Sequence, residues 1–296
     1  MATNNPKVTI GMPVYNGEAY IREALDSLLG QSYRDFELII SDNDSSDSTE
    51  QICQLYSKRD DRIIYIRQKK NIGAAENFQF VLSKARGEFF MWAASDDRWN
   101  SEWLEFVVDR MIRTGAGMCF GLVTHIDSSG LPTHSLANMA HFSHTGGPLG
   151  RRLKYFLAHE ARGKANIIYS LHRRELLEPS MWSEMIAGTC VYDHTIIYTS
   201  LLRQKQEFAP NAILFKRIHD ASLGRDTDSS SGYRLYFKKL VRALIPFPPR
   251  LIAEYLRHSS FIEKCTLITC FPIKLVGAYL FNIKRIHSKI SYRIRQ

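Results

Sequence analysis

Apolar and polar residues occur in alternating blocks along the first hundred positions, and the spacing within the blocks changes regularly. Short apolar runs rich in β-branched and aromatic residues are each followed by a stretch with apolar residues three or four positions apart. The runs predict strands at residues 8–14, 36–40, 63–66 and 88–92, and the stretches between them predict helices at residues 17–29, 49–56 and 74–85. Strands that alternate with helices indicate βαβ units and a mainly parallel sheet.

The pattern continues less regularly beyond residue 97. It predicts helices at about residues 101–113, 173–177 and 192–203, strands at about residues 118–125, 166–170 and 212–217, and surface loops at residues 127–150 and 178–189. Residues 223–232 are rich in Ser, Asp and Gly, which is typical of a flexible linker. We therefore expect an α/β body over residues 1–222 and a helical tail over residues 233–296.

The charge of the chain divides it at the same place. The 296 residues include 39 Lys and Arg against 30 Asp and Glu, and 45% are hydrophobic, which is a globular composition. Residues 231–296 hold 13 of the basic residues and only Glu254 and Glu263 as acidic ones, a net charge of +11, which leaves −2 for residues 1–230. A basic tail on a slightly acidic body indicates an anionic partner for the tail.

We expect that partner to be a membrane surface. Basic residues of the tail are interleaved with aromatic and aliphatic ones at helical spacing, which is typical of a helix lying in a membrane interface. The sequence has no secretory signal pattern and no run of about 18 apolar residues, so we expect a cytoplasmic protein at the inner face of the cell membrane. Nucleic acid is not expected as a partner, because no nucleic-acid-reading motif occurs. The alternative for the tail is a packing extension or an oligomer contact.

Polar side chains follow three of the predicted strands directly. They lie at residues 13–16, 41–43 and 95–97. Ligands of parallel α/β sheets bind at the carboxyl ends of the strands, so these segments are expected to form a site. Adjacent Asp96 and Asp97 repel each other unless a cation neutralises them, and a divalent metal shared with a diphosphate would do so. The alternative is a solvated pair of carboxylates that caps the next helix.

Five motifs in sequence order carry a family resemblance. They are TIGMPVYNG at residues 9–17, QSYRDFELIISDN at 31–43, NIG at 71–73, ARGE at 85–88 and SDD at 95–97. With them, residues 7–125 resemble the nucleotide-sugar-binding half of a family 2 glycosyltransferase. The resemblance implies the GT-A fold, a Rossmann-like α/β architecture with a mainly parallel sheet flanked by helices. Residues 1–125 would form the nucleotide-sugar half and residues 126–222 the acceptor half.

The resemblance also implies roles for individual residues. Tyr15 would stack on the nucleotide base, Asp42 would accept its N–H, and Asp96 would contact the ribose or the sugar. Asp97 would bind Mn²⁺ or Mg²⁺ together with His219, although Ser95 stands where the family often has an acidic residue. The residues implied to bind the nucleotide sugar are Pro13, Val14, Tyr15, Asn16, Glu18, Asp42, Asn71, Gly73, Asp96 and Arg217.

The resemblance implies an inverting transfer that needs a general base, and Asp193 stands where the family places one. We therefore predict transfer from a UDP- or dTDP-sugar donor to a glycan or lipid-linked acceptor in cell-surface polysaccharide biosynthesis. Structural alternatives remain for several of these residues. They are Asp42 as an N-cap or Asx-turn residue, Asp193 as a first-turn helix carboxylate, His219 as an exposed strand-end residue, and Asn71 with Gly73 as an ordinary strand-to-helix turn. A catalytically silent scaffold that only binds nucleotide sugars is the alternative function.

Overall fold

The computed structural model describes residues 5–135, 138, 141–158, 163–177, 192–219 and 249–276. The strands are β1 (Val8–Val14), β2 (Phe36–Asp42), β3 (Ile63–Arg67), β4 (Phe89–Trp92), β5 (Arg98–Trp99), β6 (Met118–Ile126), β7 (Leu171–Arg173) and β8 (Gln206–Arg217). The α-helices are α1 (Ile21–Leu29), α2 (Thr49–Ser57), α3 (Ala74–Lys84), α4 (Trp103–Thr114), α5 (Pro148–Leu157), α7 (Tyr192–Arg203) and α9 (Pro249–Arg257), and a further helix covers residues 261–276. Two short 3₁₀ helices are η2 (Lys164–Tyr169) and η3 (Arg174–Leu176).

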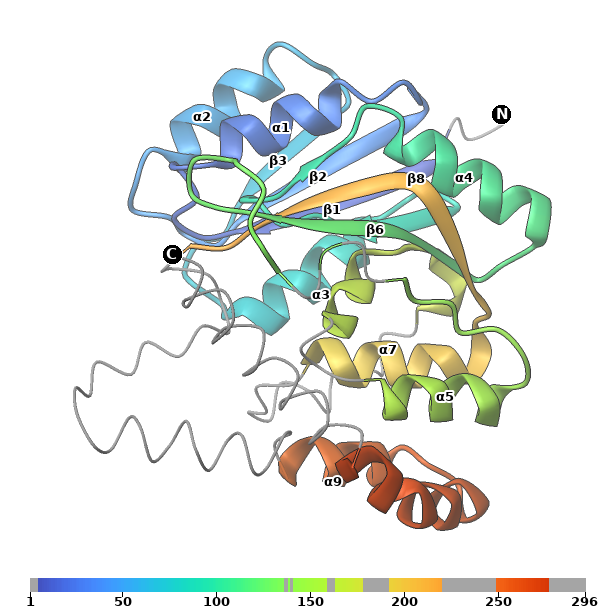
Figure 1. The fold of residues 1–296 in the computed structure, drawn as a ribbon. Helices are drawn as coiled ribbons and strands as arrows, with labels where there is room; N and C mark the ends of the chain where they lie inside the picture. Colours follow the sequence, from blue (N-terminus) through green and yellow to red (C-terminus); the bar gives the residue numbers. More distant parts are fainter. Residues whose placement is uncertain are drawn as a thin grey trace, which may run out of the picture.

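The strands form one eight-stranded sheet in the order β3-β2-β1-β4-β7-β6-β8-β5. Strands β1 to β4 pair in parallel, β6 and β8 also pair in parallel, and β7 joins these two groups by running antiparallel to β4 and to β6. Helices α1, α2 and α4 cover one face of the sheet, while α3 and α7 lie on the other face with α5 beside α7 (Figure 1). The parallel pairing brings the carboxyl ends of β1, β2 and β4 to one edge, as the sequence pattern predicted.

A glycine permits the close pairing of β6 with β8. The register of this pair shifts between Phe120 and Leu122, and a Cβ atom on Gly121 would lie only 2.0 Å from the carbonyl oxygen of Ala212. Any other residue would push the two backbones apart at this irregularity. Because the end of β8 carries cleft residues, this pairing helps to position the site.

Three predictions for the second half need correction. Residues 166–170 were expected to form a strand, but η2 occupies most of them and the strand β7 follows. Gly163, with φ +78°, starts the tight turn, in which Asn166 N–H donates to the Gly163 carbonyl. Strand β8 begins six residues before the predicted residue 212. Residues 127–150 are not wholly a surface loop, since Phe142 and His144 are buried. The predicted loop 178–189 and linker 223–232 lie outside the described residues.

The described part of the tail packs against α5 and α7. Tyr255 of α9 is buried, and the Arg152 guanidinium of α5 donates to Glu263 at 2.7 Å and also to the carbonyl of His258. Glu263 accepts the N–H of Ser260 as well, which caps the start of helix 261–276. For residues 249–276, the packing interpretation of the tail is therefore correct.

Removing the Glu263 carboxylate should destabilise this packing. Glu263→Ala would leave the buried Arg152 guanidinium without its counter-charge, which typically costs about 3–5 kcal/mol of unfolding free energy. Urea denaturation of the full chain measures the loss. Lys264→Ala on the exposed side of the same helix is the control and should change the free energy by less than about 0.5 kcal/mol. Equal effects of the two substitutions would contradict the role of the buried pair.

Candidate active site

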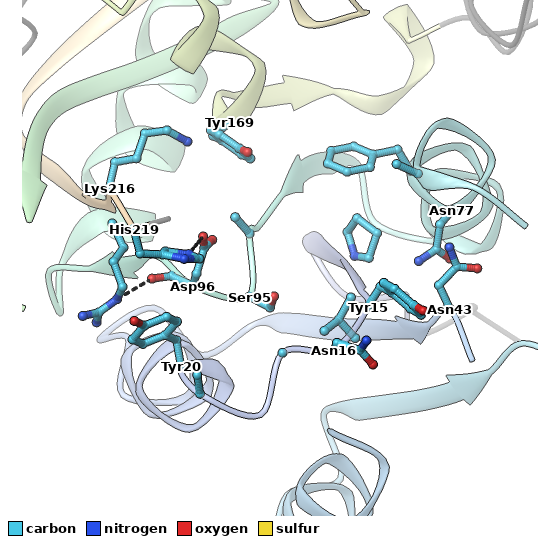
Figure 2. A pocket seen from close by; sticks show the side chains of 18 of the residues that line it. Tyr15, Asn16, Tyr20, Asn43, Asn77, Ser95, Asp96, Tyr169, Lys216 and His219 are labelled. Carbon is cyan, nitrogen blue, oxygen red and sulfur yellow. Dashed lines mark hydrogen bonds and ion pairs between the residues drawn. The ribbon is translucent and has the colours of Figure 1, made fainter. Parts of the chain in front are cut away.

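A cleft of about 980 Å³ opens at the edge where the carboxyl ends of the strands meet. Its walls come from the segments after β1, β2 and β4, from the start of α3, from η2 and from the end of β8 (Figure 2). The predicted site residues that line it are Pro13, Val14, Tyr15, Asn16, Asn71, Asp96, Arg217 and His219. Tyr15 is 53% exposed, so its ring offers a free face to a ligand. This position fits the general rule for α/β sheets.

Asp96 and His219 form a polar pair on the cleft wall. The Oδ2 atom of Asp96 lies 2.9 Å from Nε2 of His219, although the two residues are 123 positions apart. The His219 ring also lies against Tyr20, with ring centroids 4.9 Å apart. Figure 2 shows these three side chains converging below Tyr169 and Lys216. The pair places a carboxylate and an imidazole where a metal-bound anion could meet them.

Asp97 lies behind this wall and does not line the cleft. Its Oδ1 atom accepts the N–H of Arg217 at 2.8 Å, and its buried Oδ2 atom accepts no hydrogen bond from the described residues. Burial raises the pKa of Asp97 to about 6, against the opposing charge of Lys216. The structure therefore differs from the prediction for this pair: Asp96, rather than Asp97, presents its carboxylate to the cleft.

Lys216, which the sequence analysis did not name as a site residue, brings a positive charge into the cleft. Its Nζ atom lies 3.8 Å from Oδ2 of Asp97 and 4.8 Å from the centroid of the Tyr169 ring. Burial by itself would lower the pKa of Lys216, but Tyr169 and the nearby Asp97, Asp96 and Asp193 carboxylates outweigh burial and raise the pKa. The side chain is therefore a permanent cation that faces the space above Asp96.

Arg217, the next residue, lines the cleft, but its guanidinium is bonded within the protein. Its guanidinium is buried and donates to Glu23 at 2.7 Å and to the carbonyl of Asp96 at 3.0 Å. It also donates to the carbonyls of Asp127 and Ser128. These bonds occupy the guanidinium, so Arg217 holds the Asp96 turn in place and is not free to bind the nucleotide sugar as predicted.

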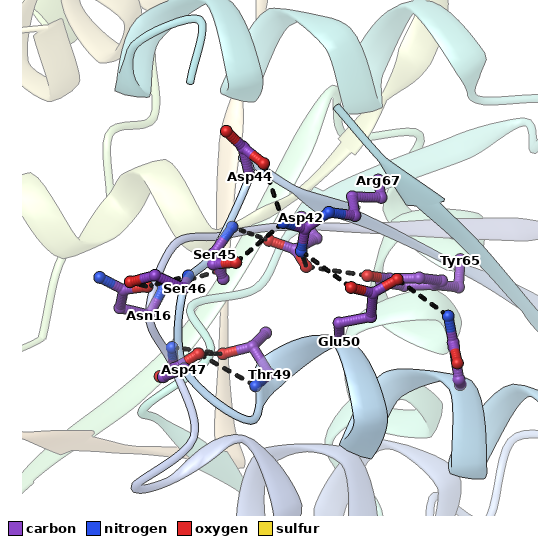
Figure 3. Close-up of polar contacts among 12 residues, drawn as sticks. Asn16, Asp42, Asp44, Ser45, Ser46, Asp47, Thr49, Glu50, Tyr65 and Arg67 are labelled. Carbon is purple, nitrogen blue, oxygen red and sulfur yellow. Dashed lines mark hydrogen bonds and ion pairs between the residues drawn. The ribbon is translucent and has the colours of Figure 1, made fainter. Parts of the chain in front are cut away.

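Asp42 is likewise buried in a polar network and does not line the cleft (Figure 3). Its Oδ1 atom accepts the N–H of Ser45, and its Oδ2 atom accepts from the Tyr65 hydroxyl at 2.8 Å and from Arg67 at 3.2 Å. Both oxygens are thus satisfied within the protein. The structure supports the Asx-turn alternative for Asp42 and leaves no acceptor on its carboxylate facing the ligand space.

Two further predicted binders also maintain loop structure. Glu18 accepts the N–H of Ser48, which ties the segment after β1 to the start of α2. Gly73 has φ +93°, a conformation that glycine adopts readily, and its carbonyl accepts from Asn43 at 3.1 Å. Glu18 and Gly73 do not line the cleft, whereas Asn43 does.

Asp193 lies in the first turn of α7, which begins at Tyr192, and it does not line the cleft. Its side chain is solvent-accessible, yet enough protein surrounds it to raise the pKa of its carboxyl by desolvation. The charge of Lys216 acts in the opposite direction, so Asp193 lies within electrostatic reach of the cleft. An accessible carboxylate of raised pKa beside a cleft is suited to accepting a proton.

The donor set of the cleft fits a metal shared with an anion. Among the described residues, no group of three or more His, Cys, Asp and Glu could enclose a metal ion. Asp96 could supply a carboxylate ligand and His219 a nitrogen ligand, and the oxygens of a bound diphosphate could supply others, since Mg²⁺ is usually held by one or two carboxylates together with substrate phosphates. The buried Oδ2 atom of Asp97 adds negative charge behind them.

Comparison with known proteins agrees with this geometry. Residues 9–172 match the family model described as Glycosyl transferase family 2. The chain belongs to glycosyltransferase family 2. This assignment confirms the resemblance seen in the five motifs.

The glycosyltransferase resembles several bacterial enzymes in sequence. It is 27% identical to the GalNAc(5)-diNAcBac-PP-undecaprenol β-1,3-glucosyltransferase of Campylobacter jejuni, over 95% of this chain and 84% of that one. It is 33% identical to the putative teichuronic acid biosynthesis glycosyltransferase TuaG of Bacillus subtilis, over 45% of this chain and 52% of that one. The chain spans 16%, 52% and 29% of the lengths of three curated relatives that it matches.

Solved structures confirm the GT-A fold of this glycosyltransferase. Staphylococcus aureus TarS residues 1–349 in complex with UDP-GlcNAc superimpose with a TM-score of 0.58 at 19% identity, over 88% of this chain and 69% of that one. A mannosyltransferase from Pyrobaculum calidifontis in complex with GDP-Man and Mn²⁺ superimposes with a TM-score of 0.50 at 18% identity, over 95% of this chain and 88% of that one.

The sequence reasoning missed several cleft residues of the glycosyltransferase. They are Tyr20, Asn77, Phe78, Tyr169 and Lys216. One signal could have identified Lys216: it lies at the carboxyl end of the predicted strand 212–217, where ligands of such sheets bind. No comparable local signal marks Tyr169, because η2 reaches the cleft only through the tertiary fold.

Replacing Asp42 should affect stability more than nucleotide binding. Asp42→Asn would leave donors among Ser45, Tyr65 and Arg67 without an acceptor, which costs about 1–3 kcal/mol of unfolding free energy. Denaturant titration measures this loss. Asp44→Asn removes the more exposed partner of Arg67 and should cost less than about 1 kcal/mol. Unchanged stability with a large loss of UDP affinity would instead show that Asp42 reads the base.

Proposed function

We propose that this glycosyltransferase moves a sugar, with inversion, from a nucleoside diphosphate donor to a hydroxyl of a glycan or lipid-linked acceptor. The observation that carries this proposal is the cleft in which Tyr15, the Asp96 and His219 pair, and Lys216 converge. The donor would be a UDP- or dTDP-sugar. The names of the Campylobacter and Bacillus relatives support an acceptor in cell-surface polysaccharide assembly.

The cleft offers separate contacts for the parts of a nucleotide sugar. The exposed ring of Tyr15 would stack on the base, beside Pro13, Asn16 and Asn71. At the opposite end, Asp96 and His219 would hold Mn²⁺ or Mg²⁺ against the diphosphate. When bound, this metal would stabilise the negative charge of the leaving group. Asp97 would act from behind, by fixing the backbone of Arg217 and adding charge to the site.

Lys216 would bind the diphosphate directly. Its raised pKa keeps it charged, and within the described part of the chain its ammonium makes only the 3.8 Å ion pair with Asp97 and the contact with the Tyr169 ring. A charge-assisted bond to a phosphate oxygen would be stronger than a neutral one. Lys216 would thus neutralise charge that develops as the bond from the sugar to the diphosphate lengthens.

Asp193 would act as the general base. The acceptor oxygen would form a bond to the anomeric carbon, the bond from that carbon to the β-phosphate oxygen would break, and the acceptor proton would pass to the Asp193 carboxylate. Attack from the face opposite the leaving group gives inversion. Lys216 assists indirectly, because its charge opposes the desolvation that raises the pKa of Asp193 and so keeps more of the carboxylate ionised at neutral pH.

Removing the proposed base should abolish transfer without removing donor binding. Asp193→Asn is expected to lower kcat by about 100-fold or more, the usual scale of general base catalysis, with donor affinity within about twofold of the original. Single-turnover sugar transfer and calorimetric titration of UDP with Mn²⁺ measure the two quantities. Asp61→Asn, at an exposed site on another loop, is the matched control. Retained transfer by Asp193→Asn would refute its role as base.

Replacing Lys216 should lower the affinity for a ligand more, the more phosphate charge that ligand carries. Lys216→Met is expected to lower the affinity for UDP about tenfold or more and to leave the weak affinity for uridine unchanged, because only the diphosphate contacts the ammonium. Thermal shift titrations with both ligands provide the comparison, and the exposed Lys58→Met is the control. Equal losses for uridine and UDP would show that the substitution acts through the shape of the cleft.

A further inference from the structure

The helix over residues 261–276 has the reverse of the usual distribution of side chains. Its charged residues Glu263 and Lys274 are buried, with 7% and 3% of their surface exposed. Five of its large apolar residues lie on the opposite side and are exposed by 58% to 81%; they are Phe261, Ile262, Ile268, Ile273 and Val276. A helix on a globular protein normally buries its apolar side and exposes its polar side.

The buried contacts fix which side faces outward. Glu263 pairs with Arg152, Leu267 is 2% exposed, and the Lys274 ammonium donates to the carbonyl of Phe156 in α5. Residues 263, 267 and 274 lie on one side of an α-helix, since they are separated by about one and three turns. Rotating the helix to hide its apolar side would break all three contacts. The apolar side is therefore held outward by the packing of the tail.

The charge around the apolar side has a single sign. Lys264 is the exposed charged residue of this helix, and Arg257 at the end of α9 is also exposed. After Glu263 the sequence contains seven Lys and Arg residues and no Asp or Glu. In Figure 1 the two helices form the outermost layer, on the side of α5 and α7 that faces away from the sheet. An apolar surface bordered by cations is complementary to a lipid bilayer that carries anionic headgroups.

We propose that the apolar side of helix 261–276 docks the protein onto an anionic lipid surface, with the helix lying in the plane of the interface. Among the described residues, no helix is both long enough and apolar enough to cross a bilayer. A second copy of this chain is the less suitable occupant. Two such sides in contact would bring two tails of the same positive charge together, which is unfavourable unless anions separate them.

This proposal is independent of the chemistry proposed for the cleft. It concerns Phe261, Ile268 and Ile273, which take no part in the site described above. It adds a reason for the position of the tail, since docking by this side would hold the enzyme at the surface where a lipid-linked acceptor would be found. The lipid contact can be tested without any sugar donor.

Co-sedimentation of the full chain with vesicles tests the docking. Vesicles of phosphatidylcholine with about one third phosphatidylglycerol should bind the protein at least tenfold more tightly than vesicles of phosphatidylcholine alone, and high salt should weaken the binding. The triple variant F261Q/I268Q/I273Q should lose at least tenfold in affinity. The matched control is I112Q/L131Q, which alters two exposed apolar residues elsewhere and should bind as the original does.

Two results would overturn the proposal. One is binding by the triple variant equal to that of the original chain, with circular dichroism showing that both are folded. The other is a dimer of the original chain in light scattering that the triple variant lacks, together with no vesicle binding, which would assign the apolar side to a second copy. Transfer to a soluble acceptor by the triple variant distinguishes loss of docking from failure of the proposed function, because docking does not alter the cleft.

Discussion

The cleft depends on one junction, where the end of β8 meets the turn after β4. Asp97 accepts the backbone N–H of Arg217, and the buried Arg217 guanidinium returns to the carbonyl of Asp96 and to Glu23 of α1. These contacts join segments 120 to 194 residues apart, and Asp97 and Arg217 are both buried, where an unpaired charge would be costly. The junction therefore orders both walls of the cleft at once: the Asp96 side and the His219 side.

The same junction separates residues that hold the fold from residues that face a ligand. Along β8, the pleat directs Arg217 toward α1 and Lys216 toward Tyr169. Between the adjacent carboxylates, Asp97 is taken up by the backbone and Asp96 is left at the surface of the cleft beside His219. Each pair of neighbours thus contributes one structural and one ligand-facing charge. A similar division occurs after β2, where Asp42 is buried and Asn43 lines the cleft.

In the tail, too, one set of side chains holds the fold while another set stays exposed. Arg152 and Glu263 are buried together, and Lys274 is satisfied by the carbonyl of Phe156, so the polar side of helix 261–276 is used for attachment to α5. The apolar side is consequently left outside. In water this arrangement has a cost that grows with the exposed apolar area, and a lipid surface would remove it. The basic sequence after Glu263 is consistent with such a surface.

The sequence by itself determined the order of strands and helices through residue 126 except for the short strand β5, the family, and the presence of carboxylates at the strand ends. These features are readable because hydrophobic period and short motifs are local properties of the chain. It did not determine β7, the start of β8, or which of Asp96 and Asp97 faces the cleft.

Nor did the sequence show that the side chains of Asp42 and Arg217 are hydrogen-bonded within the protein, or that Lys216 enters the site. Those features depend on contacts between segments far apart in the chain, such as Asp97 with Arg217 and Arg152 with Glu263. Only the tertiary structure decided them, because burial and the partner of a charged side chain are set by what packs against it and not by its neighbours in sequence.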